Sequence, residues 1–175
     1  MLKHDKHTPA NSIILIGMPA SGKSTVGVIL AKVLGYDFID TDILIQNREG
    51  CRLENIIKSK GIEQFLAIES DVCTRLHASG AVIATGGSVI YSDRAMRHLK
   101  TLGTVIYLHV DLEGLKQRLR DIAQRGVVLR EGQSVDDLYK ERTPLYETYA
   151  DYTVPEKSMS LEDTVTAVCE LVRNK

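Results

Sequence analysis

A glycine-rich stretch near the start of the chain carries residue types and spacings that suit phosphate binding. In GMPASGKSTVG, which begins at Gly17, the residues Gly17, Gly22, Lys23 and Ser24 match the pattern G-x-x-x-x-G-K-[ST]. The backbone N–H groups of such a loop and of the helix after it attract anions. Lys23 can bridge the β- and γ-phosphates of a nucleotide, and the Ser24 hydroxyl can ligate Mg²⁺. The stretch therefore predicts a site for a nucleoside triphosphate.

Two alternatives to a kinase-type phosphate site can be weighed from the residues. A glycine-rich turn that caps an ordinary helix is the simpler one, but the complete motif between an apolar strand and a helix favours nucleotide binding. A GTPase is the other, because DLEG (Asp111–Gly114) matches D-x-x-G. That string leads into a predicted helix, and no N-K-x-D string for guanine recognition is present in the sequence. A GTPase is therefore disfavoured.

Two carboxylates stand where the second predicted strand meets the next predicted helix. Asp40 and Asp42 flank Thr41, and in a parallel sheet this position lies at the carboxyl edge, beside the phosphate loop. One carboxylate can hold the water shell of Mg²⁺, and the other can accept a proton from an attacking hydroxyl, as a kinase needs. The alternative is that Asp42 only favours a helix N-terminus through the helix dipole. The neighbouring phosphate loop favours the catalytic interpretation.

Two further segments suit phosphoryl transfer. ATGGS (Ala84–Ser88) ends the third predicted strand in glycines, which let a substrate lie against backbone N–H groups. The segment from Lys116 to Arg130 carries five basic residues and one acid, as is typical of a lid that closes over a triphosphate. The alternative for ATGGS is a plain turn between a strand and a helix. The alternative for the basic segment is a helix face exposed to solvent.

The elements that must position these residues alternate between strand and helix. Short β-rich runs occupy residues 12–16, 36–40, 81–85, 104–110 and 151–154. Apolar spacing and capping signals predict helices over 23–34, 41–49, 53–60, 62–77, 92–99, 112–121, 134–149 and about 161–172. The third and fourth strands are apolar on both faces, which favours a parallel sheet covered on both sides. The sequence predicts one doubly wound α/β domain over residues 12–175, with residues 1–11 as a polar tail and a lid at about 118–133.

Composition limits the classes of function. The chain has 175 residues and a formal net charge of -1, so it can form one domain with a full core and shows no overall basic bias toward nucleic acids. Its apolar runs are far shorter than a membrane span. Its three cysteines are widely spaced and form neither a zinc pattern nor a disulfide framework, which favours a reducing compartment. We therefore expect a cytoplasmic protein without a nucleic-acid or membrane partner.

One carboxylate lies on an apolar helix face. Phe65, Val72 and Leu76 form a stripe on the predicted helix 62–77, and Glu69 lies in that stripe, four residues after Phe65. A carboxylate that faces inward needs a partner. A structural arginine such as Arg142 is one candidate, and a group of the substrate is the other.

Taken together, these motifs resemble the shikimate kinase family of P-loop kinases, which are similar to nucleoside monophosphate kinases. GMPASGKSTVG, FIDTD, ATGGS, the basic lid and ERTPLYE occur in the order and spacing of that family, and the resemblance covers residues 13–172. It implies a three-layer α/β fold with a five-stranded parallel sheet in the order 2-3-1-4-5. It also implies transfer of the γ-phosphoryl group of ATP, with Mg²⁺, to a hydroxyl of shikimate.

The resemblance assigns roles to positions of this chain. Asp40 corresponds to the acid that serves the metal together with Ser24, and Asp42 to the acid that holds the substrate hydroxyls and is the candidate base. Arg125 best matches the lid arginine that reaches the phosphates. The predicted catalytic residues are Lys23, Asp42 and Arg125. The predicted nucleotide-binding residues are Gly17, Ala20, Ser21, Gly22, Lys23, Ser24, Thr25, Arg118, Arg120 and Pro155. Of these, Pro155 and either Arg118 or Arg120 correspond to residues that flank the adenine. The predicted substrate-binding residues are Asp42, Leu66, Glu69, Gly86, Gly87, Ser88 and Arg142, with Arg142 matching the arginine that binds the substrate carboxylate.

The chain departs from the family pattern in three places. Leu66 stands where the family has an arginine after a phenylalanine, Ser88 takes the third place of a three-glycine turn, and RGVVL replaces the lid string R-P-L-L. Loss of one arginine weakens the binding of a carboxylate, because each charged hydrogen bond contributes about 1.5–3 kcal/mol. The less cationic pocket suits a less anionic alcohol, or one that bears an amine.

Three acceptor classes and one non-catalytic function therefore remain as alternatives to a shikimate kinase. The acceptor could be a sugar acid, a polyol or a hydroxy amino acid. A nucleotide-binding module without turnover is the alternative from another class, and the pair Asp40 and Asp42 argues against it. We expect a monomer that acts on a small molecule.

Overall fold

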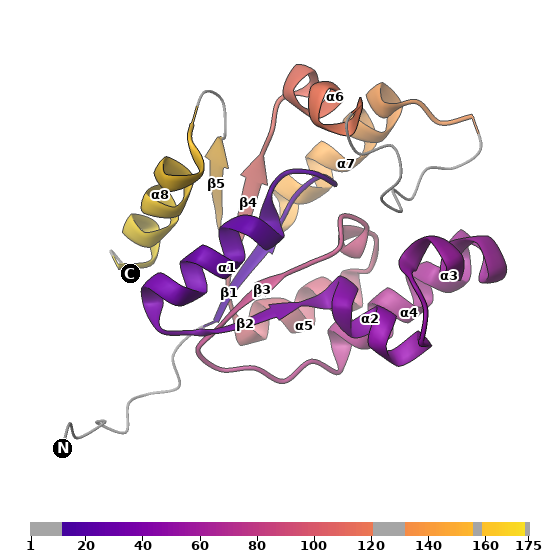
Figure 1. Cartoon of the computed structure of the whole chain (residues 1–175), viewed down its shortest axis with the longest axis horizontal. Helices are drawn as coiled ribbons and strands as arrows, with labels where there is room; N and C mark the ends of the chain where they lie inside the picture. Colours follow the sequence, from indigo (N-terminus) through magenta and orange to yellow (C-terminus); the bar gives the residue numbers. More distant parts are fainter. Residues whose placement is uncertain (1–11, 121–131, 156–158, 174–175) are drawn as a thin grey trace.

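The expected strands pair in parallel in a computed structural model that describes residues 12–120, 132–155 and 159–173 (Figure 1). The sheet has five strands in the order β2-β3-β1-β4-β5, as the sequence predicted. The strands are β1 (Ser12–Ile16), β2 (Asp37–Asp40), β3 (Ala81–Ala84), β4 (Gly103–His109) and β5 (Tyr152–Pro155). Because all of them run in the same direction, their carboxyl ends share one edge of the sheet.

Helices connect the strands and cover the sheet. They are α1 (Lys23–Leu34), α2 (Thr41–Glu49), α3 (Leu53–Lys60), α4 (Ile62–Thr74), α5 (Asp93–Leu102), α6 (Leu112–Arg120), α7 (Val135–Tyr149) and α8 (Leu161–Arg173), with a 3-10 turn at Val89–Tyr91. The capping box that Ser134 and Asp137 predicted is present at the start of α7. The helix predicted over residues 62–77 ends earlier, at Thr74. Leu76 then packs into the core from outside the helix, so its place in the apolar stripe was wrong.

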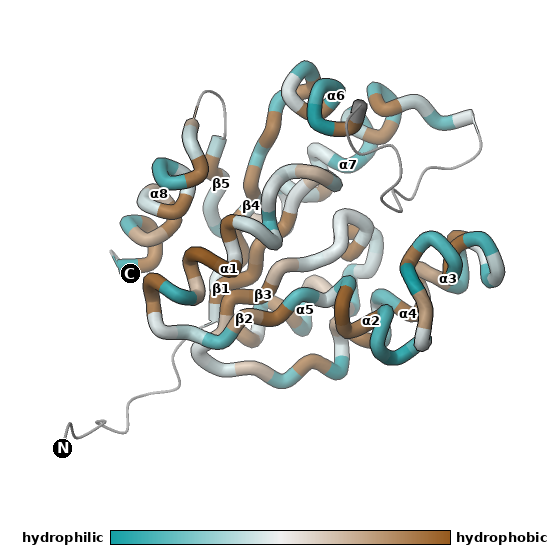
Figure 2. The backbone as a smooth tube through the Cα atoms, in the orientation of Figure 1, coloured by the Kyte–Doolittle hydropathy of each residue, from teal (hydrophilic) through white to brown (hydrophobic). Residues whose placement is uncertain are grey.

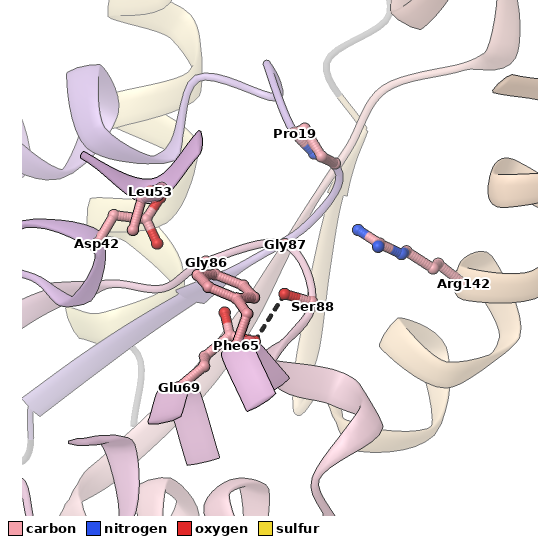
Figure 3. Close-up of a pocket in the computed structure, with 9 residues that line it drawn as sticks. All are labelled: Pro19, Asp42, Leu53, Phe65, Glu69, Gly86, Gly87, Ser88 and Arg142. Atoms are coloured by element: carbon pink, nitrogen blue, oxygen red, sulfur yellow. Dashed lines mark hydrogen bonds between the residues drawn. The ribbon is translucent and has the colours of Figure 1, made fainter. Parts of the chain in front are cut away.

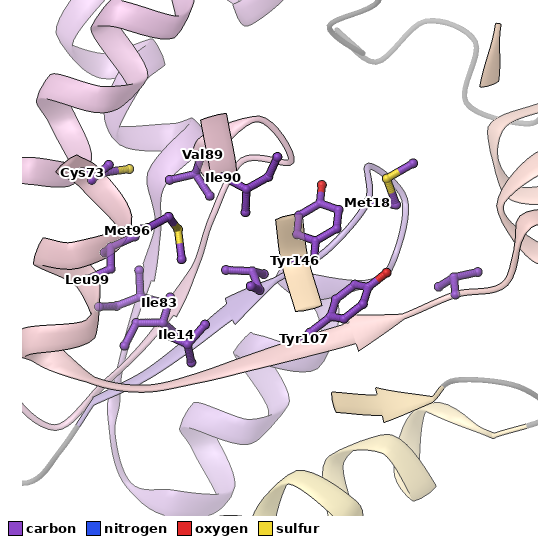
Figure 4. Close-up of a cluster of buried hydrophobic side chains, with 14 of the residues drawn as sticks. Ile14, Met18, Cys73, Ile83, Val89, Ile90, Met96, Leu99, Tyr107 and Tyr146 are labelled. Carbon is purple, nitrogen blue, oxygen red and sulfur yellow. The ribbon is translucent and has the colours of Figure 1, made fainter. Parts of the chain in front are cut away.

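Strand β1 separates two apolar layers because its side chains alternate between the faces of the sheet. Ile13 and Leu15 pack with α1 and α8, whereas Ile14 and Ile16 belong to the cluster on the opposite face. Figure 4 shows that second cluster, in which Tyr107 and Tyr146 stack with ring centroids 5.0 Å apart. The result is the expected three-layer arrangement, with both faces of the sheet covered.

The helices after β2 form a small unit of their own beside that edge of the sheet (Figure 1). Ile45, Ile56 and Phe65, from α2, α3 and α4, make a separate buried cluster. Figure 2 shows hydrophobic residues along the strands and hydrophilic residues on the outer faces of these helices. Within the ranges that the structure describes, no helix combines the length and the apolar character needed to cross a membrane.

Candidate active site

The phosphate loop joins β1 to α1 at the carboxyl edge of the sheet. Its backbone is left-handed at Ala20 (φ 63°) and at Gly22 (φ 85°), the N-cap of α1. The buried Lys23 ammonium donates hydrogen bonds to the carbonyl oxygens of Gly17 (2.9 Å) and Met18 (2.7 Å), within the loop. A cation and a helix N-terminus therefore meet at one point, and this arrangement fits the phosphates of ATP.

Close packing holds the loop in place. A Cβ atom at Gly17 would lie 2.7 Å from the carbonyl oxygen of Leu108 in β4, so only glycine fits there. The buried Ser21 hydroxyl lies 3.3 Å from the Lys23 ammonium, whereas Thr25 is exposed on the first turn of α1. Arg118 Nη1 donates a hydrogen bond to the Ala20 carbonyl oxygen at 3.2 Å, which brings α6 against the loop.

Ser24 and Asp40 place two oxygen atoms side by side next to this loop. The Ser24 hydroxyl donates a hydrogen bond to Asp40 Oδ2 at 2.7 Å. The other oxygen, Asp40 Oδ1, accepts a hydrogen bond from the backbone N–H of Asp42 at 2.9 Å and caps α2, which fixes the carboxylate. Mg²⁺ prefers oxygen ligands and takes one or two from the protein alongside phosphate oxygens and water. Ser24 and Asp40 therefore offer oxygen atoms of the kind that Mg²⁺ prefers, and their role as its ligands stays a prediction.

Asp42 is the second carboxylate of this edge. Burial and the neighbouring charge of Asp40 raise the pKa of Asp42 from 3.8 to about 6, against the opposing effect of Lys23. At neutral pH the carboxylate is therefore ionised and is a stronger base than an ordinary aspartate. Asp42 can accept a proton from a hydroxyl group that lies beside the phosphate loop.

A cavity of about 50 Å³, which we call the acceptor cavity, lies next to Asp42 (Figure 3). It is lined by Pro19, Asp42, Leu53, Phe65, Glu69, Gly86, Gly87, Ser88 and Arg142. Its lining joins Pro19 of the phosphate loop to α2, α3, α4, the turn after β3, and α7. All but one of the predicted substrate-binding residues meet here, and the exception is Leu66.

Gly86 is the point where two carboxylates approach the turn after β3. A Cβ atom at this position would overlap Glu69 Oε1 and lie 2.8 Å from Asp42 Oδ1. The Gly86 N–H donates a hydrogen bond to Thr41 Oγ1 at 3.1 Å, which holds the turn against α2. Because Gly86 has no side chain, both carboxylates have room to lie close to its backbone.

Replacing Gly86 by alanine should disturb the acceptor cavity and leave the nucleotide site intact. The added methyl group displaces Glu69 and Asp42, so we expect KM for the acceptor to rise about tenfold or more. The overlap should also reduce the free energy of unfolding by about 1–3 kcal/mol. Steady-state kinetics and urea unfolding measure the two effects, with KM for ATP as the internal control. An unchanged acceptor KM would contradict this role of Gly86.

Glu69 is buried on α4, and only one of its two carboxylate oxygens has a hydrogen-bond partner among the described residues. Its side chain is 1% exposed, and Oε2 accepts a hydrogen bond from the Ser88 hydroxyl at 2.6 Å. Oε1 has no hydrogen-bond partner among the described residues. Burial raises the pKa of Glu69 from 4.5 to about 7, opposed by the Ser88 hydrogen bond and, more weakly, by Arg142. The sequence suggested either Arg142 or a group of the substrate as the partner, but this hydrogen bond comes from Ser88.

The stability of the protein should depend on pH through Glu69. Its pKa is 4.5 as a free group and about 7 in the fold, so its contribution to stability is fully present below pH 4.5 and is lost as pH rises to about 7. Glu69→Gln cannot ionise and keeps an oxygen for the Ser88 hydroxyl. We expect this variant to be more stable than the parent by about 1–3 kcal/mol at pH 8 and equal to it near pH 4.5. Urea unfolding at both pH values tests this, with the exposed Glu63→Gln on the same helix as control. A difference in stability between Glu69→Gln and the parent that is the same at both pH values would refute this pH dependence.

Arg142 forms the opposite wall of the acceptor cavity (Figure 3). It is 1% exposed, and its guanidinium carbon lies 5.1 Å from the centroid of the Tyr91 ring. Arg142 Nε donates a hydrogen bond to the Tyr91 hydroxyl at 3.0 Å, and that hydroxyl donates to Glu141 Oε1 at 2.8 Å. A buried guanidinium held in this way can bind a carboxylate.

Two tyrosines that support this site were missed by the sequence reasoning. Tyr91 holds Arg142, and the Tyr146 hydroxyl donates a hydrogen bond to the Gly87 carbonyl oxygen. Tyr146 lies four residues after Arg142 and therefore on the same face of α7, which is the signal that could have found it. No comparable local signal points to Tyr91, because it approaches Arg142 from a distant part of the chain.

Leu66 lies beside the acceptor cavity and not in its wall, which corrects its predicted place. It lines a neighbouring hollow of about 270 Å³. We call this space the Leu66 hollow; its lining residues are Glu63, Leu66, Ala67, Glu69, Ser88, Tyr91 and Ser92. Glu69 and Ser88 line both spaces, so the hollow adjoins the acceptor cavity.

The remaining predicted residues concern the nucleotide. Arg120 ends α6, and Arg125 falls in residues 121–131, outside the described part of the chain. Most of the expected lid therefore lies outside it too. Pro155 ends β5 with an exposed side chain and lines a hollow with Met159 and Ala167. Its contact with adenine stays a prediction.

The chain matches known proteins over most of its length. The sequence profile of the shikimate kinase family matches residues 19–173. Shikimate kinases of Histophilus somni and Pasteurella multocida are each 35% identical to this chain, over 93% of it and 95% of their own length. A crystallised shikimate kinase from Acinetobacter baumannii, in complex with shikimate, superposes with a TM-score of 0.85 at 31% identity and 94% coverage of both chains. The shikimate kinase of Bacteroides thetaiotaomicron superposes with a TM-score of 0.77 at 26% identity, over 93% of this chain and 98% of its own.

Proposed function

The chain belongs to the shikimate kinase family, whose members use ATP to phosphorylate an alcohol, and we propose that it transfers the γ-phosphoryl group of ATP to a hydroxyl of shikimate. One observation carries the proposal. The acceptor cavity is lined by Pro19 of the phosphate loop as well as by Asp42, so a hydroxyl at the candidate base would lie next to bound phosphates. The relative solved with shikimate supports this choice of acceptor.

In the proposed reaction, Asp42 accepts the proton of the acceptor hydroxyl as its oxygen attacks the γ-phosphorus. The bond from that phosphorus to the β–γ bridging oxygen breaks, and ADP leaves. Lys23 and the N-terminus of α1 stabilise the negative charge that spreads over the phosphate oxygens. Arg142 holds the carboxylate of the acceptor and orients the ring. Arg118 steadies the phosphate loop from α6, and Arg125 is proposed to reach the phosphates.

Ser24 and Asp40 are proposed to hold Mg²⁺. A bound magnesium ion supplies positive charge to the β- and γ-phosphate oxygens. The Ser24 hydroxyl and Asp40 Oδ2 lie 2.7 Å apart, so these two oxygen atoms would be available together as ligands. Removal of divalent cations with EDTA should abolish turnover, and added Mg²⁺ should restore it.

An ADP-release assay with MgATP and shikimate tests the proposed function. We expect ADP release to require the acceptor, and mass spectrometry should detect a shikimate monophosphate. ADP release at the same rate without any acceptor would contradict phosphoryl transfer to an alcohol. ATP binding without any ADP release would favour the nucleotide-binding module instead.

We also propose a monomer that works in the cytoplasm on small molecules alone, in aromatic amino acid biosynthesis. The family membership supports the pathway. Residues 12–175 are proposed to form its single domain, with residues 1–11 as a tail and a lid at about 118–133. Light scattering of the purified chain should give a mass near 19.4 kDa, and a mass of twice that value would show a dimer.

A further inference from the structure

The Ser88 hydroxyl holds one oxygen of Glu69 and leaves the other against the turn after β3 (Figure 3). The hydroxyl belongs to a residue that is 3% exposed, and it donates to Glu69 Oε2 at 2.6 Å. Glu69 Oε1 has no hydrogen-bond partner among the described residues, and a Cβ atom at Gly86 would overlap it. Because Gly86 and Glu69 both line the acceptor cavity, Oε1 is an unused acceptor beside the space proposed for the substrate.

The turn that carries Ser88 is tied to the helices on both sides of the cavity entrance. The Gly86 N–H donates to Thr41 Oγ1 in α2 at 3.1 Å, and Ser88 donates to Glu69 in α4. Asp42 follows Thr41 directly, so the same turn holds α2, with Asp42, and α4, with Glu69. The two hydrogen bonds therefore fix the two carboxylates relative to each other.

Leu66 leaves Glu69 to this hydroxyl. It lies three residues before Glu69 on α4 and hence on the same face, and both side chains line the Leu66 hollow. A leucine side chain forms no hydrogen bond, whereas an arginine at this position could reach Glu69 through the hollow and hold it with a charge. Leu66 and Ser88, two departures from the family pattern, therefore meet at Glu69, whose partner is a neutral hydroxyl and not a cation.

A hydroxyl group of the acceptor suits Glu69 Oε1. A buried carboxylate oxygen without a donor is unfavourable, so a ligand that brings an O–H group to it is stabilised there. Asp42 Oδ1 lies 2.8 Å from the position of the same Cβ atom at Gly86, so both carboxylates approach one point. In a cavity of about 50 Å³, the two hydroxyls that they receive must then be neighbours on one molecule.

The carboxylate of the acceptor belongs to the other wall of the cavity. Arg142 is the one cation that lines this cavity in the described part of the chain, and it lies opposite Glu69 (Figure 3). Two carboxylates on one side and a guanidinium on the other hold an acid with two adjacent hydroxyls in a single orientation. An acid without the second hydroxyl leaves Glu69 Oε1 without a donor.

We propose that Ser88 positions Glu69 Oε1 to accept a hydrogen bond from a second hydroxyl of the acceptor, next to the hydroxyl that Asp42 receives. The site then selects carboxylic acids with two adjacent hydroxyls over those with one. Glu69 contacts the acceptor in this arrangement, and Ser88 is a positioning residue that acts through it. This inference rests on the proposed phosphoryl transfer and refines the way the acceptor is recognised.

Three ligands that differ in one hydroxyl give the test. The family resemblance implies phosphorylation of the hydroxyl on carbon 3 of shikimate, and the hydroxyl on carbon 4 is its neighbour. Calorimetric titration with ADP present compares shikimate, 4-deoxyshikimate and 5-deoxyshikimate at pH 8, above the pKa of about 7 of Glu69. We expect 4-deoxyshikimate to bind at least about tenfold more weakly than 5-deoxyshikimate, because only the former leaves Oε1 without a donor. Equal binding of the two deoxy analogues would overturn the inference.

Variants show the part of each residue through the ratio of these two affinities. Glu69→Leu removes the carboxylate and should reduce the ratio to about one, and Ser88→Ala frees the carboxylate and should reduce it about threefold. Ser70→Ala, on the same helix but outside both spaces, should keep the ratio of the parent. A merely structural role of Ser88 would weaken both ligands alike. A Ser88→Ala protein with the ratio of the parent would therefore refute the positioning role.

ADP release with the same ligands keeps this inference apart from the proposed function. Turnover of shikimate, together with equal binding of the two deoxy analogues, would support the function and refute the inference. Absence of turnover with all three ligands, together with the expected ratio, would refute the function and leave the hydroxyl contact of Glu69 standing. Binding of none of the three would overturn both.

Discussion

Replacing Lys23 by methionine should reduce kcat/KM for phosphoryl transfer about 100- to 1,000-fold. The ammonium group lies inside the phosphate loop, hydrogen-bonded to the carbonyl oxygens of Gly17 and Met18, and methionine keeps most of the length of the side chain without the charge. The variant loses the cation that is proposed to bridge the β- and γ-phosphates, so the transition state should lose more stabilisation than the ground state. Initial rates of ADP release at varied acceptor concentrations measure the effect.

The control for Lys23→Met is Lys32→Met, on an exposed position of the same helix. Both variants remove one positive charge from α1, but only Lys23 lies in the loop. We expect Lys32→Met to keep the rate of the parent within twofold. Urea unfolding of both variants shows whether a lost rate reflects a lost fold. A Lys23→Met enzyme that is folded and retains a tenth or more of the activity would refute the assigned role.

Replacing Asp42 by asparagine should lower kcat about 100- to 10,000-fold, because the acceptor hydroxyl loses its proposed base. Asparagine has the same shape and can still accept one hydrogen bond, so the acceptor cavity keeps its form. The affinity for ATP should stay within twofold of the parent, because Ser24, Asp40 and the phosphate loop are unchanged. Nucleotide binding by fluorescence titration and ADP release together separate the two effects.

The pH dependence of the parent enzyme adds an independent check on Asp42. Its pKa of about 6 means that the base is protonated, and inactive, below that pH. We expect kcat/KM to fall tenfold for each pH unit below about 6 and to level off above it. Asp37→Asn, at the opposite end of β2, should show the same profile as the parent. A profile of the same shape in Asp42→Asn would assign the titration to another group.

The sequence predicted the parts of the site that depend on neighbouring residues. The phosphate loop from Gly17 to Ser24 could be read because strand, turn and helix follow each other directly. The pair Asp40 and Asp42 could be placed because parallel strands end at a common edge. The order of the strands was also confirmed, although it came from the family resemblance and not from the residues alone.

Contacts between distant elements were not accessible from the sequence. Glu69 was recognised as an inward-facing carboxylate, but its partner Ser88 lies 19 residues away, on the turn after β3. Tyr91 and Arg142 are 51 residues apart, and no local sequence pattern in either segment predicts their contact. Leu66 was placed in the acceptor site because of a missing arginine, and only the packing of α4 shows that it lines the adjacent hollow.

Because β1 lies at the centre of the sheet, it cannot pair during synthesis on the ribosome until later strands have been made. This strand, apolar from Ile13 to Ile16, is the first of the five to be made, yet it pairs with Val82 in β3 and with Gly103 in β4. At a synthesis rate of about 5–20 residues per second, it waits for several seconds before either neighbour exists. Such high contact order slows folding and leaves an aggregation-prone segment open to chaperones.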